Sequence, residues 1–265
     1  MIVCRSQAEL DRLRRANALV AAVLQRLAVM VVPGISTAEI DAEAERLVRA
    51  AGAEPAFKGY HGYPATICAS VNDQVVHGIP SKAPLGEGDI VSIDMGAKLD
   101  GFYGDSAVTV GVGRISDEAE RLLRVTEASL FEGIAAVKPG ARVSDIGAAV
   151  QAHVEAAGFS VVREFVGHGI GTALHEEPQI ANYGPGGRGP RLAEGMVLAI
   201  EPMVNVGKAA VKVLKDGWTA VTKDGSLSAH FEHTVVVTAD GCEILTRPPR
   251  DAGADRATAS AGARR

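Results

Sequence analysis

The sequence predicts an α+β fold of two similar halves, related by a pseudo-two-fold axis, whose strands form a curved, mainly antiparallel sheet covered by helices. Three features support this prediction: a strand–turn–strand pattern over residues 93–106, amphipathic helical runs beside the strands, and an internal repeat over about 31–110 and 137–245. We expect residues 1–246 to form a single domain. Residues 247–265 contain almost no large apolar residue, so we expect a disordered tail there.

Helical and strand-forming runs alternate along the chain, separated by capping residues and by glycine or proline. The first expected helix ends at Pro33 and Gly34, and the second runs from Ser36 or Thr37 to about Ala51 and is closed by Gly52. Two strands are expected at 65–71 and 75–80, around a turn at Asn72 and Asp73. A third helix is expected from Ser116 or Asp117 to Val137.

The hairpin at residues 93–106 carries an aspartate near each end, Asp94 and Asp105. The dipeptide Asp100 and Gly101 is a typical two-residue hairpin turn, and it places Asp105 opposite Gly96. Since Gly96 and Asp94 are two residues apart on one strand, both carboxylates point to the same face of the sheet. Two like charges that close in an apolar segment are costly without a cation between them, so the hairpin predicts a metal site.

The second half of the chain repeats landmarks of the first. Pro33 recurs as Pro139 at an offset of 106, and the strand that ends at Asp94 recurs, at an offset of 107, as one that ends at Glu201. Similarity among alanine-rich helices would produce part of this match by chance, but the proline–glycine and leucine-x-glutamate-glycine anchors favour a duplication. A site between two such halves would receive a carboxylate from each equivalent strand.

The composition excludes several classes of protein. The net charge is −5 and the sequence has no basic block, so we expect no nucleic-acid recognition. No apolar run reaches the length of about 20 residues that a membrane span needs, and the apolar stretch at 16–24 is better explained by an amphipathic surface helix than by a signal peptide. The three cysteines, Cys4, Cys68 and Cys242, lie far apart, which favours a reducing compartment; we expect Cys4 and Cys242 to be small core residues.

Taken together, the charged residues inside apolar strands predict a dinuclear metal site. Buried carboxylates are rare unless they are paired or bound to a metal, and here Asp94, Glu201 and Glu232 all lie in otherwise apolar strands. With Asp105 they would balance two divalent cations, and His168 would add a neutral ligand. Two such ions can bridge a water and lower its pKa, which suits attack on a peptide carbonyl. Taken singly, each residue would more often be structural.

Several motifs make the sequence similar to one known family: GYHGYP, HGIP, IDMGAKLDGFYGD, GHGIG with HEEP, IEPM, and EH before a β run. The chain resembles the type I methionine aminopeptidases of the pita-bread (creatinase/aminopeptidase) metallopeptidase fold over about residues 8–245. The resemblance implies a metal-dependent hydrolase that removes the initiator methionine from nascent proteins and prefers a small second residue. The nucleophile would be water or hydroxide held by two divalent ions, Co, Mn, Fe(II) or Zn.

The resemblance also assigns roles residue by residue. It implies that the metal ligands are Asp94, Asp105, His168, Glu201 and Glu232, and that Glu201 also acts on the water. It implies that His77 contacts the substrate amide and that His175 assists at the scissile carbonyl. The residues implied to border the methionine pocket are Tyr60, Tyr63, Phe57, Cys68 and Trp218. Three residues depart from the family pattern: Leu174 replaces an aromatic residue, Phe57 replaces a cysteine, and His230 replaces a glutamine.

Two alternatives stay open at this point. Prolidases and aminopeptidase P share the five-ligand site, although they usually carry an extra N-terminal domain. A non-catalytic relative could use the fold to bind RNA or protein, although such proteins typically lose ligands and gain basic extensions. For the leading hypothesis we expect a cytoplasmic monomer whose partners are nascent polypeptide N-termini, with transient association with the ribosome and none with a membrane.

Overall fold

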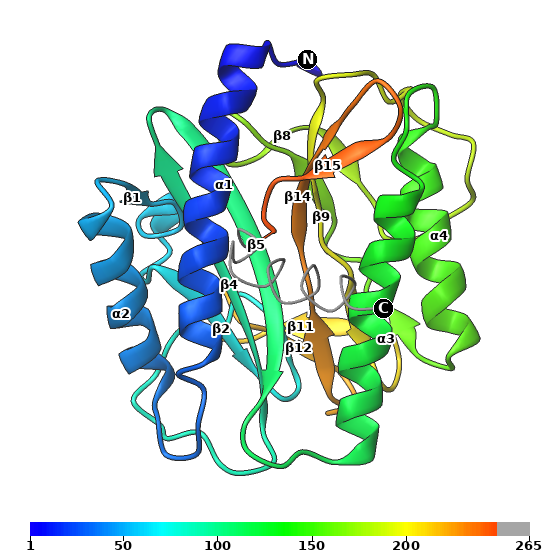
Figure 1. Cartoon of the computed structure of the whole chain (residues 1–265). Coiled ribbons are helices and arrows are strands. Elements are labelled where there is room, and N and C mark those ends of the chain that lie inside the picture. The colour runs from blue at the N-terminus through cyan, green and yellow to red at the C-terminus, as the bar shows by residue number, and fades with distance from the viewer. Residues whose placement is uncertain (248–265) are drawn as a thin grey trace, which may run out of the picture.

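The structure, a computed structural model, describes residues 1–247, and it has the α+β architecture that the sequence predicts (Figure 1). Apart from residue 247, the tail predicted to be disordered lies outside the described residues. Two helices pack beside the strands of the first half and two beside those of the second, with the strands between the pairs. Along residues 1–247, no helix combines the length and the apolar character needed to cross a membrane.

The first half contains two long helices, a short 3-10 helix and five strands. In chain order they are α1 (Gln7–Ala28), α2 (Thr37–Ala50), β1 (Glu54–Pro55), η1 (Tyr60–Gly62), β2 (Ile67–Val71), β3 (Gln74–Val76), β4 (Ile90–Leu99) and β5 (Phe102–Gly111).

The second half contains two helices and ten short strands. These are α3 (Asp117–Ala135), α4 (Val143–Ala156), β6 (Ser160–Val161), β7 (Gly167–Gly169), β8 (Glu176–Ile180), β9 (Val197–Ile200), β10 (Met203–Asn205), β11 (Val211–Val213), β12 (Ala220–Thr222), β13 (Ser228–His230), β14 (His233–Val237) and β15 (Cys242–Ile244).

The central hairpin is formed by β4 and β5 with the predicted turn and register. Asp100 and Gly101 have φ values of 51° and 83°, as a two-residue turn that fits the twist of the strands requires. Gly96 pairs with Asp105, and Asp94 pairs with Ala107. The two aspartates therefore share one face of the hairpin, as predicted.

Four predicted boundaries are wrong. Helix α3 ends two residues early, at Ala135 rather than at Val137. Two of the other three coincide with a tertiary hydrogen bond. Helix α1 ends at Ala28 rather than at Pro33, since Gly34 N donates to Leu85 O at 2.8 Å and draws this segment away from the helix. Strand β2 begins at Ile67 rather than at residue 65, because the backbone N–H of Thr66 donates to Asp41 Oδ1 instead of to a strand. Strand β3 ends at Val76, since His77 adopts a φ of 60°.

The two halves have equivalent local geometry. Helices α2 and α4 begin and end 106 residues apart, at Thr37 and Val143 and at Ala50 and Ala156. The β-bridge of Ser36 with Pro84 in the first half has its counterpart in the bridge of Arg142 with Arg191 in the second. In both places the residues before the helix pair with the segment that precedes the central strand, so the same sequence landmarks produce the same contacts.

The strands pair in four antiparallel sheets, and the halves meet at the hairpin. Strand β4 pairs with β5 along one edge and with β1 and β2 in succession along the other, while β9 lies between β7 and β14. The halves are joined where Glu232 N donates to Ala107 O at 2.9 Å and Ser106 Oγ donates to Glu232 O at 2.7 Å. Thr234 Oγ1 also donates to Asp105 O at 2.8 Å. The seam therefore runs directly through predicted site residues.

Separate apolar cores support each half. One core lies under α1 and α2 and includes Ile40, Ile93 and Met95, and the other lies under α3 and α4 and includes Ile146 and Leu198. Val108 of β5 packs against both. The cysteines do not follow the prediction: Cys4 is exposed, because it lies in the segment before α1, and Cys242 is half-buried on the short strand β15.

Candidate metal and substrate site

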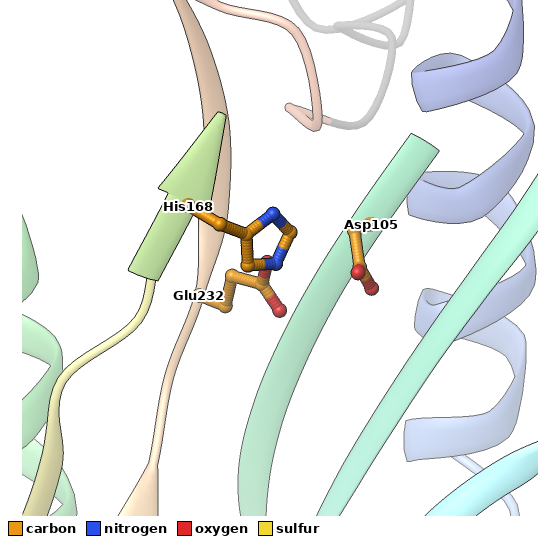
Figure 2. A group of neighbouring side chains, drawn as sticks. All are labelled: Asp105, His168 and Glu232. Carbon is orange, nitrogen blue, oxygen red and sulfur yellow. The ribbon is translucent and has the colours of Figure 1, made fainter. Parts of the chain in front are cut away.

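Five predicted side chains come together at the seam between the halves, and each comes from a different segment. Asp94 lies on β4, Asp105 on β5, His168 on β7, Glu201 directly after β9, and Glu232 between β13 and β14. Figure 2 shows Asp105, His168 and Glu232 converging from these three segments. One ligand atom from each of these three lies within 4.8 Å of the others.

The carboxylates fit a cation, because their buried oxygens lack other partners. Within residues 1–247, Asp94 Oδ1, Asp105 Oδ1 and Glu232 Oε1 are buried and accept no hydrogen bond. Asp105 is 4% exposed and Glu232 is 2% exposed. A buried carboxylate oxygen without a partner loses the solvation of its charge, and a divalent cation restores it. The donor set of four carboxylates and one imidazole therefore suits divalent ions of the first transition row.

Burial of the carboxylates and their closeness to one another also shift their pKa values. Burial raises the pKa of Asp94, Glu201 and Glu232, and the neighbouring carboxylates raise it further. Burial also raises the pKa of Asp105, to about 7. Without a cation, these groups would therefore retain protons at neutral pH, because four ionised carboxylates repel one another. A cation would displace those protons.

Two histidines flank Glu201, one beside each of its oxygens. His168 Nε2 lies 3.5 Å from Glu201 Oε1, and His230 Nε2 lies 3.6 Å from Glu201 Oε2. Burial lowers the pKa of His168 to about 4, with a smaller effect from His175, and lowers that of His230 to about 3. Both imidazoles are therefore neutral at pH 7, which is the form that ligates a metal.

His77 and His175 also face the cavity above the carboxylates. Burial, and then the neighbouring His175, lowers the pKa of His77 to about 4. The hydroxyl of Tyr60 lies 2.8 Å from His175 Nδ1, and the rings of His175 and His168 lie with their centroids 4.4 Å apart. Burial lowers the pKa of His175 as well. In the tautomer in which Nδ1 accepts the proton of the Tyr60 hydroxyl, neutral His175 carries its own proton on Nε2, which is then a hydrogen-bond donor.

The cavity measures about 280 Å³, and every residue predicted for the site lines it. Its lining comprises Phe57, Tyr60, His61, Tyr63, Cys68, His77, Asp94, Asp105, His168, Leu174, His175, Glu201, Trp218 and Glu232. The carboxylates gather at one place and an aromatic wall surrounds the rest. The rings of Tyr63 and Trp218 meet edge to face with centroids 5.1 Å apart, which fixes part of this wall.

The local sequence explains how these side chains are presented. Glycine at position 96 is required, because a Cβ there would lie 2.9 Å from the ring of Phe57 and 3.0 Å from Ala56. Tyr63 is held in place because its hydroxyl donates to Gly78 O at 2.9 Å and to Ile67 O at 3.0 Å. The wall of the cavity is thus built around the hairpin that carries the aspartates.

Sequence reasoning missed His61, and it noted Leu174 and His230 only as departures from a family pattern. His61 lies between Tyr60 and Gly62 with a φ of 49°, and its ring meets that of Tyr60 at a centroid distance of 4.4 Å. The two glycines of the GYHGYP motif were the available signal, since they indicate an irregular backbone. His230 is 1% exposed, and its Nε2 has no hydrogen-bond partner among the described residues.

A cavity with these groups can bind a peptide end and hydrolyse it. The carboxylates and His168 would hold cations, Glu201 would accept a proton, and a neutral imidazole would stabilise negative charge on a carbonyl oxygen. The aromatic and apolar wall would hold an uncharged side chain, because removing its apolar surface from water is favourable.

Comparisons with known proteins show the family to which the chain belongs. A profile of the metallopeptidase family M24 matches residues 11–239. Methionine aminopeptidase 1 of Bacillus subtilis is 55% identical over 247 residues, which cover 93% of this chain and 100% of that protein. The crystal structure of methionine aminopeptidase from Rickettsia prowazekii has a TM-score of 0.92 and 42% identity, over 93% of this chain and 100% of that one.

A prolidase structure from Pyrococcus horikoshii shares the fold, with a TM-score of 0.77 and 22% identity. The match covers 95% of this chain and 65% of the prolidase. The fold is therefore shared with a structure whose sequence is much less similar to this chain.

Proposed function

We infer, since the chain belongs to metallopeptidase family M24, that it is a methionine aminopeptidase, a metal-dependent hydrolase that removes the N-terminal methionine of a polypeptide. The observation that supports this best is the group of carboxylates that line a cavity together with aromatic residues and whose buried oxygens have no hydrogen-bond partner in the described part of the chain. The sequence likeness to methionine aminopeptidases over nearly their whole length supports the same substrate.

We propose that Asp94, Asp105, His168, Glu201 and Glu232 hold two divalent ions, chosen among Mn, Fe(II), Co and Zn. Bound divalent ions would supply a Lewis acid and a water of lowered pKa. The four carboxylates would neutralise two such ions, and His168 is the neutral ligand of the set. This stoichiometry is tested by metal analysis of the purified protein after dialysis against each ion.

The remaining roles fall to groups that face the cavity. Glu201 would accept the proton of the attacking water, because it is the carboxylate flanked by two neutral imidazoles. His175 would donate a hydrogen bond to the scissile carbonyl oxygen as negative charge develops on it. His77 would contact the amide of the substrate, which places the peptide bond between these groups.

The apolar wall would select methionine. Tyr60, Tyr63, Phe57, Cys68 and Trp218 border the cavity, and a thioether packs favourably against aromatic rings. Burial, and then the charge of Asp94, raises the pKa of Cys68, so its thiol is uncharged and suits an apolar subsite. We propose that a small second residue is preferred. Comparing Met-Ala-Ser with Met-Leu-Ser tests that preference directly.

We propose that the enzyme works in the cytoplasm on nascent chains, as a monomer that associates transiently with the ribosome. Residues 1–246 would form one catalytic domain. Sedimentation of the purified protein, alone and with ribosomes, tests the oligomeric state and the association.

The activity itself is tested by incubating a Met-Ala-Ser peptide with protein and each divalent ion, and following loss of methionine by mass spectrometry. Ala-Pro-Ser serves as the comparison, because a prolidase-like specificity would favour it. Absence of methionine release with every ion would contradict the proposal.

The role of Glu201 gives a sharper prediction. We expect Glu201→Gln to abolish turnover, because the amide neither accepts the proton of water nor carries the charge that a cation needs. Glu118→Gln, on the exposed surface of α3, is the matched control and should keep full activity. Steady-state rates of both variants on Met-Ala-Ser decide the matter, and near-normal turnover by Glu201→Gln would refute the assignment.

A further inference from the structure

Arg5 lies in the segment before α1, and it belongs to none of the sequence motifs that predict the site. Its side chain is only 5% exposed, although arginine is usually a surface residue. Its backbone N–H donates to Gly195 O at 2.8 Å. A Cβ on Gly195 would lie 2.9 Å from Arg5 O and 3.0 Å from Arg5 N, so the absence of a side chain at residue 195 leaves room for this segment.

The guanidinium group of Arg5 reaches the loop that carries His175. It donates to Glu176 Oε2 and forms an ion pair with that carboxylate, whose side chain is 15% exposed. It also lies 3.7 Å from Glu9 Oε1. A Cβ on Gly171 would overlap the guanidinium, so the glycine at this position allows the loop and the arginine to pack together.

Glu176 connects Arg5 to the backbone of the loop that contains His175. Its Oε1 accepts hydrogen bonds from Thr172 N at 2.8 Å and from Ala173 N at 3.1 Å. Burial raises the pKa of Glu176, but these N–H groups and the Arg5 guanidinium outweigh burial, so the net pKa is lowered. The carboxylate is therefore charged, and it holds the loop backbone with one oxygen and Arg5 with the other.

His175 directly precedes Glu176 in the chain, and its ring forms a hydrogen bond with the Tyr60 hydroxyl. On the other side of the loop, Tyr103 N donates to Gly171 O at 2.8 Å. The position of the His175 ring thus depends on anchors at the beginning and the end of a short loop, and Arg5 with Glu176 forms the anchor at the end.

We propose that Arg5 is a positioning residue, which acts through Glu176 to fix the loop at residues 171–175 and so the ring of His175. The inference rests on the proposed function for its account of His175. A group that stabilises a developing charge loses much of its effect when it is displaced by a fraction of an ångström. Arg5 would therefore influence the chemical step without touching the substrate.

The test is Arg5→Gln, which keeps the size and polarity of the side chain but removes the charge and the fork of donors. We expect kcat on Met-Ala-Ser to fall by about 5- to 50-fold while KM and the bound metal content stay close to wild type. Arg5→Lys should recover part of the loss, since it restores the charge. Arg15→Gln is the matched control, because the ion pair of Arg15 with Asp100 is exposed on both sides, and it should leave kcat unchanged.

A double-variant comparison separates positioning from general loosening. In a His175→Ala background, Arg5→Gln should have almost no additional effect on kcat, because the group it positions is gone. A full additional loss in that background would overturn the proposal, and so would an unchanged kcat in folded Arg5→Gln. If His175→Ala alone has wild-type activity, the role proposed for His175 fails first, whatever Arg5→Gln does. Circular dichroism of each variant establishes that it is folded.

Discussion

At the scale of single residues, the site combines groups whose charges are unbalanced with groups whose orientation is fixed. Asp105 and Glu232 carry buried oxygens that have no hydrogen-bond partner within residues 1–247, whereas His175 and Tyr63 are each held by a hydrogen bond to a neighbour. The unbalanced groups suit a cation and the fixed groups suit a substrate. The same division separates what would bind metal from what would recognise a peptide.

His175 offers a prediction at this scale. We expect His175→Ala to lower kcat by about 10² to 10⁴, because a donor to the developing oxyanion is removed. Tyr60→Phe, which removes the hydroxyl 2.8 Å from Nδ1 but keeps the ring, should have a much smaller effect. Rates on Met-Ala-Ser under saturating metal measure both. A larger loss in Tyr60→Phe than in His175→Ala would show that the histidine is not the group that acts.

The residues of the site were largely predictable, because a carboxylate inside an apolar strand is costly wherever the strand packs. Asp94, Glu201 and Glu232 are such residues. His61 was not predictable in this way, since its place in the cavity lining follows from a backbone φ of 49° inside the short helix η1. Nothing in the periodicity of a sequence encodes that angle.

At the scale of elements, the hairpin of β4 and β5 depends on a close approach to helix α1. The helix crosses β5 at Gly104, where a Cβ would lie 2.9 Å from backbone atoms of Ala16 and Asn17. Gly104 is the neighbour of Asp105, so the contact that seats the helix also fixes the strand beside a proposed ligand. The predicted register of the hairpin was correct because its turn residues determine it locally.

We expect Gly104→Ala to lower the free energy of unfolding by about 1 to 3 kcal/mol, because the added methyl group meets helix backbone, which cannot rotate away. Gly241→Ala is the matched control: a Cβ there meets no atom of residues 1–247 within 4 Å, so its effect should stay within about 0.5 kcal/mol. Urea unfolding of both variants tests this. Equal urea midpoints for the two variants would show that α1 moves to make room for the methyl group without lowering the free energy of unfolding.

Two of the boundaries that sequence reasoning misplaced share a physical cause. Thr66 satisfies its N–H on Asp41 of α2, and Gly34 satisfies its N–H on Leu85, so each leaves the element its local sequence favours. Propensity and periodicity describe neighbours in the chain, whereas these hydrogen bonds join residues far apart in it. Such errors amount to a few residues at the ends of elements whose type was predicted correctly.

At the scale of the whole molecule, the two halves meet at their most highly charged buried residues. Each half has its own apolar core, and hydrogen bonds around Asp105 and Glu232 lie at the seam. Two further apolar clusters pack across the seam, one with Leu13 and Ile170 and one with Val76 and Met203. The stability of the assembled chain should therefore depend on whether these carboxylates are protonated, ionised or bound to a cation.

The metal-free protein should be less stable at pH 8 than at pH 7, a range above the one in which the buried histidines, with pKa values lowered to about 4 or 3, affect stability. The folded-state pKa of Asp105 is about 7, above the unfolded value near 4, and those of Asp94, Glu201 and Glu232 are also raised. A raised carboxylate pKa contributes stability that is complete below the unfolded pKa and is lost as pH rises through the folded pKa. After treatment with a chelator, we expect the melting temperature to fall by at least about 2 °C over this range.

Manganese added at pH 8 should raise that melting temperature, because ions that bind only the folded state stabilise it. The double variant Asp94→Asn with Glu232→Gln serves as the control, since it removes two of the raised carboxyl groups and should flatten the dependence on pH. A chelated wild-type protein that melts at the same temperature at both pH values would contradict the charge balance described here.

The seam between the halves also sets an order of events during synthesis. The hairpin with Asp94 and Asp105 leaves the ribosome first and can form locally, but the residues that would share a cation with it arrive later, and Glu232 is the last of them. A chain that stops before His168 therefore lacks three of the five proposed donors. Metal loading would then be the closing step of maturation, and a new enzyme molecule would begin to process other chains only after its own second half has folded against the first.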